Sequence, residues 1–228
     1  MSTMPTSTKT IKNNSEISVS EFYPKFKKLA IESDFDFDDD CASHFEVCRF
    51  LEEFEVLGKE NPFFTIDGVL YYDKKKFLTP KGTAEKNIIW SCCHGLRGEG
   101  VDYSGVFLVA VPPAFRQKNL TIPDGVIGIC CSAFANTAIE NLFIPNSVRI
   151  IGMGTFRNME SLTNLYVPKH LMDRVEVDHN NVFHNVNIMY NDYTSTSYDD
   201  AENWKCILQG VCPPHYPKKE YTFEDDPF

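Results

Sequence analysis

A five-residue pattern, Asn-Leu-x-[Ile/Val]-Pro, occurs three times at nearly constant spacing, and it limits the fold of this chain more than any other feature. The copies begin at Asn119, Asn141 and Asn164, so the spacings are 22 and 23 residues. The residues between the copies also match in register, as Phe134 does with Phe156. A fixed-period echo of this kind is typical of repeat architectures, in which successive units stack on one another.

Each unit of the repeat predicts a short strand followed by a turn. The Leu-x-Ile segment alternates inward apolar and outward residues, as a β-strand does. The proline has no N–H and ends the strand pairing, and turn-forming residues such as Asp124-Gly125 follow it. A single unit cannot bury its own apolar side chains, so stacked units must share a continuous core.

The segment IPNSVRIIGMGTFRNMESLTNLYVP resembles the BspA-like leucine-rich repeat, also called the Treponema pallidum-type repeat. The usual pattern of that family is I-P-x-S-V-x-x-I-G-x-x-A-F-x-x-C-x-x-L-x-x-I-x-I-P. The resemblance covers about residues 64–170, because IDGVLYYDKKKFLTP and LVAVPPAF are similar to segments that precede such repeats. It implies a leucine-rich-repeat solenoid in a non-enzymatic protein that binds other proteins at cell surfaces.

The flanking segments predict an α+β fold, with a short leucine-rich-repeat solenoid, an N-terminal helical cap and a C-terminal closing segment. Apolar spacing predicts helices over about residues 20–32 and 42–57. The stretch FFTIDGVLYYDKKKFL predicts a hairpin, with turn residues at Asp67-Gly68 and at Asp73–Lys75. VFLVAVPP predicts a degenerate first strand of the repeat, and residues 169–190 predict a closing helix and an edge segment.

The chain divides into three predicted parts. Residues 1–60 form an N-terminal tail and helical cap, residues 61–190 form the BspA-like leucine-rich-repeat domain, and residues 191–228 form an acidic aromatic C-terminal tail.

Charge and hydropathy exclude several classes of partner. The formal net charge of −10 argues against nucleic acid, which is bound by clusters of lysine and arginine. The chain has no run of 18 apolar residues, so membrane insertion is not expected. Its N-terminus lacks the apolar region of a secretory signal, which predicts a cytoplasmic location. The family resemblance gives the cell surface as the alternative.

The outward strand residues of the repeat form the candidate partner-binding surface. They are Thr121, Phe143 and Tyr166, with Ala110 as a fourth member, and they stack at a strand spacing of about 4.8 Å. Exposed aromatic residues on a rigid sheet suit recognition of a protein, and acidic surroundings select a basic partner. The alternative is that a flanking helix of the same chain covers this row.

The repeated asparagines form a second row, for which a structural role is expected. The side chains of Asn119, Asn141 and Asn164 can form hydrogen bonds with the backbone of the neighbouring unit.

No metal or cofactor is expected. The groups Cys41–His44–Cys48 and Cys206–Cys212–His215 lack the C-x2-C pairs typical of zinc sites. The run DFDFDDD lacks the glycine and the final glutamate of a calcium-binding EF-hand loop.

Catalysis is not expected either, so the leading hypothesis is a non-enzymatic protein-interaction module. WSCCHG places Cys92 and Cys93 beside a histidine, but nothing in the sequence marks an oxyanion hole or a phosphate-binding loop. Two alternatives remain open. The chain could be a structural subunit of a larger assembly with wrapping termini, or a thiol-dependent enzyme.

Overall fold

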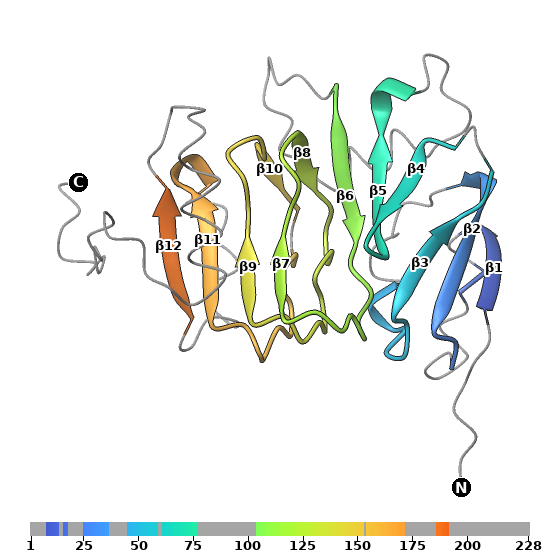
Figure 1. Cartoon of the computed structure of the whole chain (residues 1–228), viewed down its shortest axis with the longest axis horizontal. Helices are drawn as coiled ribbons and strands as arrows, with labels where there is room; N and C mark the ends of the chain where they lie inside the picture. The colour runs from blue at the N-terminus through green and yellow to red at the C-terminus, as the bar shows by residue number, and fades with distance from the viewer. Residues whose placement is uncertain are drawn as a thin grey trace, which may run out of the picture. The chain divides into compact units, whose positions relative to one another are not determined.

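The structure is a computed structural model that describes the chain in segments. The described residues are 8–13, 16–17, 25–36, 45–58, 61–76, 104–152, 154–171 and 186–191. All of them belong to one compact unit, Met1–Asp192. They form an N-terminal sheet in the order β1-β2-β3, a central sheet in the order β10-β8-β6-β5-β4, and an asparagine sheet in the order β12-β11-β9-β7 (Figure 1).

The asparagine sheet contains one strand from each repeat, as predicted, and one further strand. Its strands are β7 (Asn119–Thr121), β9 (Asn141–Phe143), β11 (Asn164–Pro168) and β12 (Asn187–Asn191). All four are parallel and in register, and Figure 1 shows them running side by side in the same direction. One asparagine of each strand therefore stands beside the asparagine of the next.

The central sheet combines the second strand of each repeat with a hairpin. The repeats contribute β8 (Val126–Ile129) and β10 (Ile150–Ile151), which pair in parallel. The hairpin joins β4 (Phe63–Ile66) to β5 (Val69–Asp73), and β6 (Val106–Ala110) links β5 to β8.

The predicted turn of this hairpin is confirmed. Asp67 and Gly68 have φ angles of 51° and 80°. Two successive positive φ angles are the mark of the type I′ turn, whose twist matches that of the two strands.

The predicted α+β class and the predicted N-terminal helical cap are wrong. The region forms a parallel sheet of β1 (Thr8–Asn13), β2 (Lys28–Asp36) and β3 (Glu53–Val56). In the segments that the structure describes, helix is limited to residues 45–46 and to short 3-10 turns such as η2 (Lys74–Lys76) and η3 (Lys169–Leu171). In the part of the chain that the structure describes, the fold is therefore a β-solenoid whose regular elements are almost all strands.

The physical reason is that inward and outward residues alternate along β2 and β3 with the period of two of a strand, which the predicted helices did not take into account. Leu29 and Ile31 are buried on one face of β2. Lys28 lies on the opposite face, where its amine forms an ion pair with Glu53 of β3. In β3, Phe54 is buried and the glutamates on either side of it are not. Because β2 pairs with a strand on each side, the period of two prevails over the local helical spacing.

A strand and the segment that leads to the next strand make up one turn of the solenoid, or coil. In the asparagine sheet and in the N-terminal sheet, successive coils are joined by the same pattern of backbone hydrogen bonds. The carbonyl of Lys118 accepts hydrogen bonds from the N–H groups of residues 140 and 141, at 2.7 and 3.0 Å. In the N-terminal sheet, the carbonyl of Lys27 accepts from residues 52 and 53, at 2.7 and 3.2 Å. The N-terminal coils thus follow the geometry of the repeats although they share no sequence echo with them.

A pair of asparagines connects the repeats to the N-terminal region. Asn158 donates its Nδ2 to Oδ1 of Asn136, and Asn136 donates its own Nδ2 to the carbonyl of Glu46, both at 3.0 Å. The two asparagines have φ angles of 56° and 63°, a left-handed conformation that asparagine tolerates better than most residues. The carbonyl of Glu46 accepts the hydrogen bond that the side-chain oxygen of an asparagine in a preceding repeat would otherwise accept.

The central sheet lies between two hydrophobic clusters, because its successive residues face opposite sides. Tyr71 and Leu108 join the cluster that contains the inward leucines of the asparagine sheet. Tyr72 and Phe107 join the cluster that contains the inward residues of the N-terminal sheet. Both sheets of parallel coils are therefore fixed to the same central sheet.

Candidate functional site

The outward face of the asparagine sheet brings together three of the four predicted partner-binding residues. Thr121 pairs with Phe143, and Phe143 pairs with Tyr166, so the three stand in one row across β7, β9 and β11. The rings of Phe143 and Tyr166 lie 6.4 Å apart between centroids, tilted by 35°.

The fourth predicted residue is elsewhere. Ala110 ends β6 in the central sheet, where it pairs with Leu70 and belongs to the cluster shared with the N-terminal sheet. The apolar pattern of β6 resembles that of a repeat strand, but the hairpin strand β5 recruits β6 into the central sheet. The structure does not bring Ala110 to the row.

Burial differs along the row. Thr121 is exposed, whereas the exposed fractions of Phe143 and Tyr166 are only 8% and 7%. Neither aromatic residue belongs to the two hydrophobic clusters of the described residues, so they are buried on the outward side of the sheet. The accessible end of the row is its polar end.

The side chains of Asn119, Asn141 and Asn164 form an asparagine row beside these residues, and the hydrogen bonds between them all run in the same direction. Asn164 donates its Nδ2 to Oδ1 of Asn141, and Asn141 donates its Nδ2 to Oδ1 of Asn119, both at 2.6 Å. Hydrogen bonding between units is as expected, but the partner is the next side-chain amide rather than the backbone. The row holds adjacent strands in register and thereby positions Thr121, Phe143 and Tyr166.

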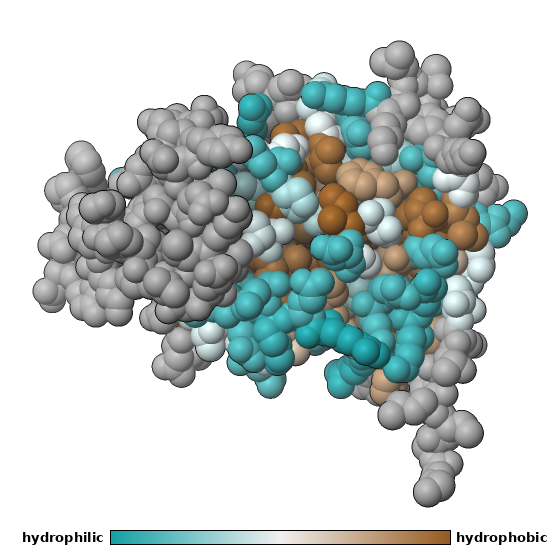
Figure 2. Space-filling model, viewed as in Figure 1, coloured by the Kyte–Doolittle hydropathy of each residue, from teal (hydrophilic) through white to brown (hydrophobic). Residues whose placement is uncertain are grey.

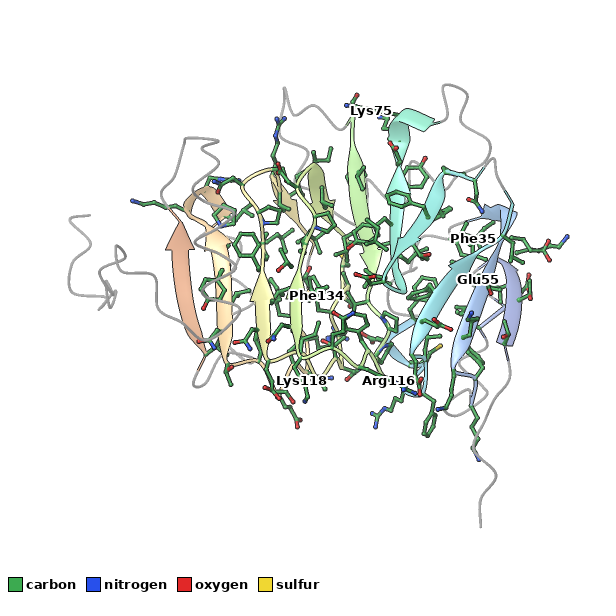
Figure 3. All side chains as sticks on the ribbon, in the orientation of Figure 1. Phe35, Glu55, Lys75, Arg116, Lys118 and Phe134 are labelled. Carbon is green, nitrogen blue, oxygen red and sulfur yellow. The ribbon has the colours of Figure 1, made fainter. Side chains whose placement is uncertain are left out.

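The charged residues next to the row are paired with one another. Lys118, before β7, meets Glu140, before β9, at 3.0 Å. In the N-terminal sheet, Lys27 meets Glu52 at 2.7 Å, and Arg116 also binds Glu52. Figure 3 labels Arg116 and Lys118 at the lower edge of the view, and Figure 2 shows hydrophilic residues along that edge. The border of the row is therefore of mixed charge.

These ion pairs shift the titration of Glu52. The hydrogen bond from Lys27 lowers the pKa of Glu52 below its ordinary value, and Arg116 acts in the same direction, while partial burial opposes both. Glu52 is therefore fully ionised at neutral pH and supports the link between the N-terminal coils and Arg116.

Candidate metal and thiol chemistry finds little support in the part of the chain that the structure describes. Cys48 is fully buried, and burial raises the pKa of its thiol to about 12, which suits a core residue rather than a metal ligand. The described residues hold no group of three or more His, Cys, Asp and Glu side chains arranged for a metal ion. The candidates Cys41, His44, Cys92 and Cys93 lie outside the described residues.

Other predictions also concern segments outside those residues. They include Cys206, Cys212 and His215, and the C-terminal tail invoked for the wrapping-termini alternative. The three-part domain division stays a prediction. Among the described segments, no helix has the length and hydropathy needed to cross a membrane.

The asparagine sheet contains a fourth strand, β12, that the three copies of the pattern do not predict. Asn187 stands opposite Asn164 in the register of β12 and β11, and the same spacing of 23 residues leads from one to the other. The signal was Asn187-Ile188, which repeats the Asn-Leu of the earlier copies. This copy departs from the five-residue pattern because Asn191 stands where the other strands have proline.

The repeat segment matches a known family. Residues 114–199 match the family described as the BspA type leucine rich repeat region, in six copies. This confirms the predicted resemblance for that part of the chain. None of the curated proteins compared with the chain matches it.

Two solved structures are similar at low sequence identity. One is a leucine-rich repeat protein from Eubacterium ventriosum, with 18% identity and a TM-score of 0.43, covering 72% of this chain and 32% of that one. The other is titled a leucine rich cell surface protein from Faecalibacterium prausnitzii, with 12% identity and a TM-score of 0.31, covering 78% and 54%. The chain thus spans about a third of the length of the first protein and about half of the second. The predicted cytoplasmic location gains no support from these matches.

Proposed function

We propose that this chain is a non-enzymatic protein-interaction module that engages a protein partner on the outward face of the asparagine sheet. The observation that carries the proposal is the row of Thr121, Phe143 and Tyr166, held in register on adjacent strands. Thr121, the exposed member of the row, stands on an ordered strand, so a partner can contact it at low entropic cost. The repeat family supports the same class of function.

The difference in burial along the row sets the order of contact. Thr121 is accessible, so a partner meets the row first at β7. Phe143 and Tyr166 are buried, and contact with them requires a rearrangement on the outward side. The alternative, in which a segment of the same chain covers the row permanently, accounts for the same burial and predicts that only the β7 end is ever available.

A photo-cross-linking side chain introduced at Thr121 tests the proposal in the full chain. The matched control carries the same side chain at Thr10, an exposed threonine on β1 of the N-terminal sheet. We expect a discrete cross-linked partner from position 121 that is absent from position 10, identified by mass spectrometry from the native source. Equal adducts from both positions, or none from either, would refute the proposal.

Phe143→Leu and Tyr166→Phe then separate engagement of the whole row from engagement of its accessible end. Both changes keep an apolar side chain at a buried position, so a folded protein is expected. Loss of the cross-link in these variants indicates that the partner reaches the aromatic pair. An unchanged cross-link indicates contact at β7 alone.

A further inference from the structure

The first strand of the asparagine sheet contains a modification motif that the other strands lack. Asn119-Leu120-Thr121 reads Asn-x-Thr with no proline in the middle, which is the acceptor pattern for N-linked glycosylation. At the position of Thr121, the next two strands carry Phe143 and Tyr166. The motif therefore exists only at the first copy of the repeated pattern.

The structure presents both functional side chains of this motif on one accessible face. Asn119 and Thr121 are exposed, and Leu120 between them is buried in the core. The strand β7 is the edge of the asparagine sheet opposite β12. A bulky group attached here would extend from the sheet edge without displacing core residues.

The direction of the asparagine row leaves the reactive atom of Asn119 available. An N-linked sugar is attached to the side-chain amide nitrogen, Nδ2. Asn141 and Asn164 each commit this atom to the oxygen of the preceding asparagine, at 2.6 Å. Asn119 joins the row through Oδ1 only, and in the described part of the chain its Nδ2 forms no hydrogen bond.

From exposure, edge position and the uncommitted amide, we infer that Asn119 is the acceptor of an N-linked glycan. In the reaction, Nδ2 forms a bond with the anomeric carbon of a lipid-diphosphate-linked oligosaccharide. The bond between that carbon and the diphosphate oxygen breaks, the lipid diphosphate leaves with the electron pair, and Nδ2 loses one proton. Oδ1 is unchanged, so Asn119 still accepts the hydrogen bond from Asn141.

The glycan would give the edge of the sheet a function beyond partner binding. An edge strand offers unpaired backbone groups to other chains, and a bulky solvated group blocks such pairing. The inference places the chain in the secretory pathway, consistent with the cell-surface alternative. The glycan would share the exposed face of β7 with Thr121, so a partner at this end of the row would contact the glycan as well. The two proposals are tested separately, because the readout of this one is the glycan itself.

The decisive measurement is peptide mass spectrometry of the full chain from its native source, before and after enzymatic glycan release in heavy-oxygen water. We expect the peptide containing Asn119 to carry an oligosaccharide and to return as isotope-labelled aspartate at position 119. An Asn119 peptide recovered wholly unmodified would overturn the inference. A glycan found only at Asn13, which begins the other such motif, Asn13-Asn14-Ser15, would overturn it as well.

Matched variants of the full chain, each carrying Asn13→Gln to remove the other motif and directed through a eukaryotic secretory pathway, separate the motif from the fold. Thr121→Val keeps Asn119 and the asparagine row, so we expect it to fold and to lose the glycan-dependent gel shift completely. Thr121→Ser keeps the motif and should retain the shift. If Thr121→Val retains the shift, or if the wild-type chain shows none, Asn119 is not the acceptor.

Discussion

The N-terminal sheet and the asparagine sheet are two parallel stacks that reach the same geometry with different chemistry. In both, the carbonyl before a strand accepts two N–H groups of the next coil. In both, inward apolar residues pack against the central sheet. The outward contacts between strands differ, because Lys28 binds Glu53 at 3.0 Å in one stack and amides bind amides in the other.

This difference shows which parts of a coil are essential. The backbone link and the inward alternation are common to both stacks, so they are sufficient to define the coil. The outward row only fixes register, and either charge pairs or amides can do so. A search for repeated letters therefore finds the second stack and not the first.

The largest expected effect tests whether the two stacks unfold together. Phe156 and Phe54 are buried in the two different clusters, with exposed fractions of 0% and 3%. Phe156→Ala and Phe54→Ala should each cost about 3–5 kcal/mol, the usual cost of emptying a buried phenylalanine site. Because both stacks share the central sheet, we expect one cooperative transition in urea for each variant, monitored by circular dichroism and fluorescence.

Two separate transitions in the Phe54→Ala variant would contradict this expectation, since they would show that the N-terminal stack melts alone. A surface change such as Thr10→Ser serves as the control and should leave the midpoint unchanged.

A smaller effect should distinguish the amide row from the charge row. Asn141→Leu removes two hydrogen bonds and should cost about 1–2 kcal/mol, since each protein hydrogen bond contributes about 0.5–1.5 kcal/mol net. This cost should be the same at low and high salt. Lys28→Met removes ion pairs with Glu53 and Glu55 that are open to solvent, so its effect should be smaller and should shrink as salt screens them.

Urea unfolding of both variants at two ionic strengths checks this contrast. If the Asn141→Leu cost falls with salt as strongly as that of Lys28→Met, the amide row does not act through hydrogen bonds alone.

The smallest expected effect is a dependence on pH that two charged residues of the N-terminal stack, Glu52 and Lys28, confer. The pKa of Glu52 is depressed below its ordinary 4.5 by Lys27, so its stabilisation is present above that value and is lost as pH falls through the folded-state pKa. The pKa of Lys28 is raised above its ordinary 10.5 by Glu53, so its stabilisation is lost as pH rises through the higher value. Asn141→Leu should leave both slopes unchanged.

Glu52→Gln provides the check at acid pH, and Lys28→Met provides it at alkaline pH. Each variant should flatten the stability profile only on its own side. If the Glu52→Gln variant loses stability at acid pH as steeply as the wild-type chain does, Glu52 does not contribute to the pH dependence.

The sequence was sufficient for the asparagine stack because identical residues recur there at the same place in every coil. It was insufficient for the N-terminal stack, where Thr8, Lys28 and Glu53 stand at the equivalent positions with uneven spacings of 20 and 25 residues. Ala110 was misplaced for a different reason. An apolar strand pattern identifies a strand but not its neighbour, and the hairpin decided the pairing of β6.

For the same reason, the sequence predicted the candidate row of Thr121, Phe143 and Tyr166 only in part. The period of two in Leu142-Phe143-Ile144 shows that Phe143 points away from the core. It does not show what covers that face, so the burial of Phe143 and Tyr166 could not be inferred from the strand pattern.

The two outward rows differ in how they tolerate a change in the number of coils. An asparagine both gives and receives the same bond, so a coil can be inserted into that row or removed from it, and every neighbour still finds its complement. The corresponding row of the N-terminal sheet has three different members, Thr8, Lys28 and Glu53, so the loss of the middle coil, or the insertion of a coil after it, removes the pair of Lys28 with Glu53. Gene duplication can therefore lengthen the amide stack one unit at a time, whereas a coil duplicated between β2 and β3 interrupts the ion pair of the N-terminal stack.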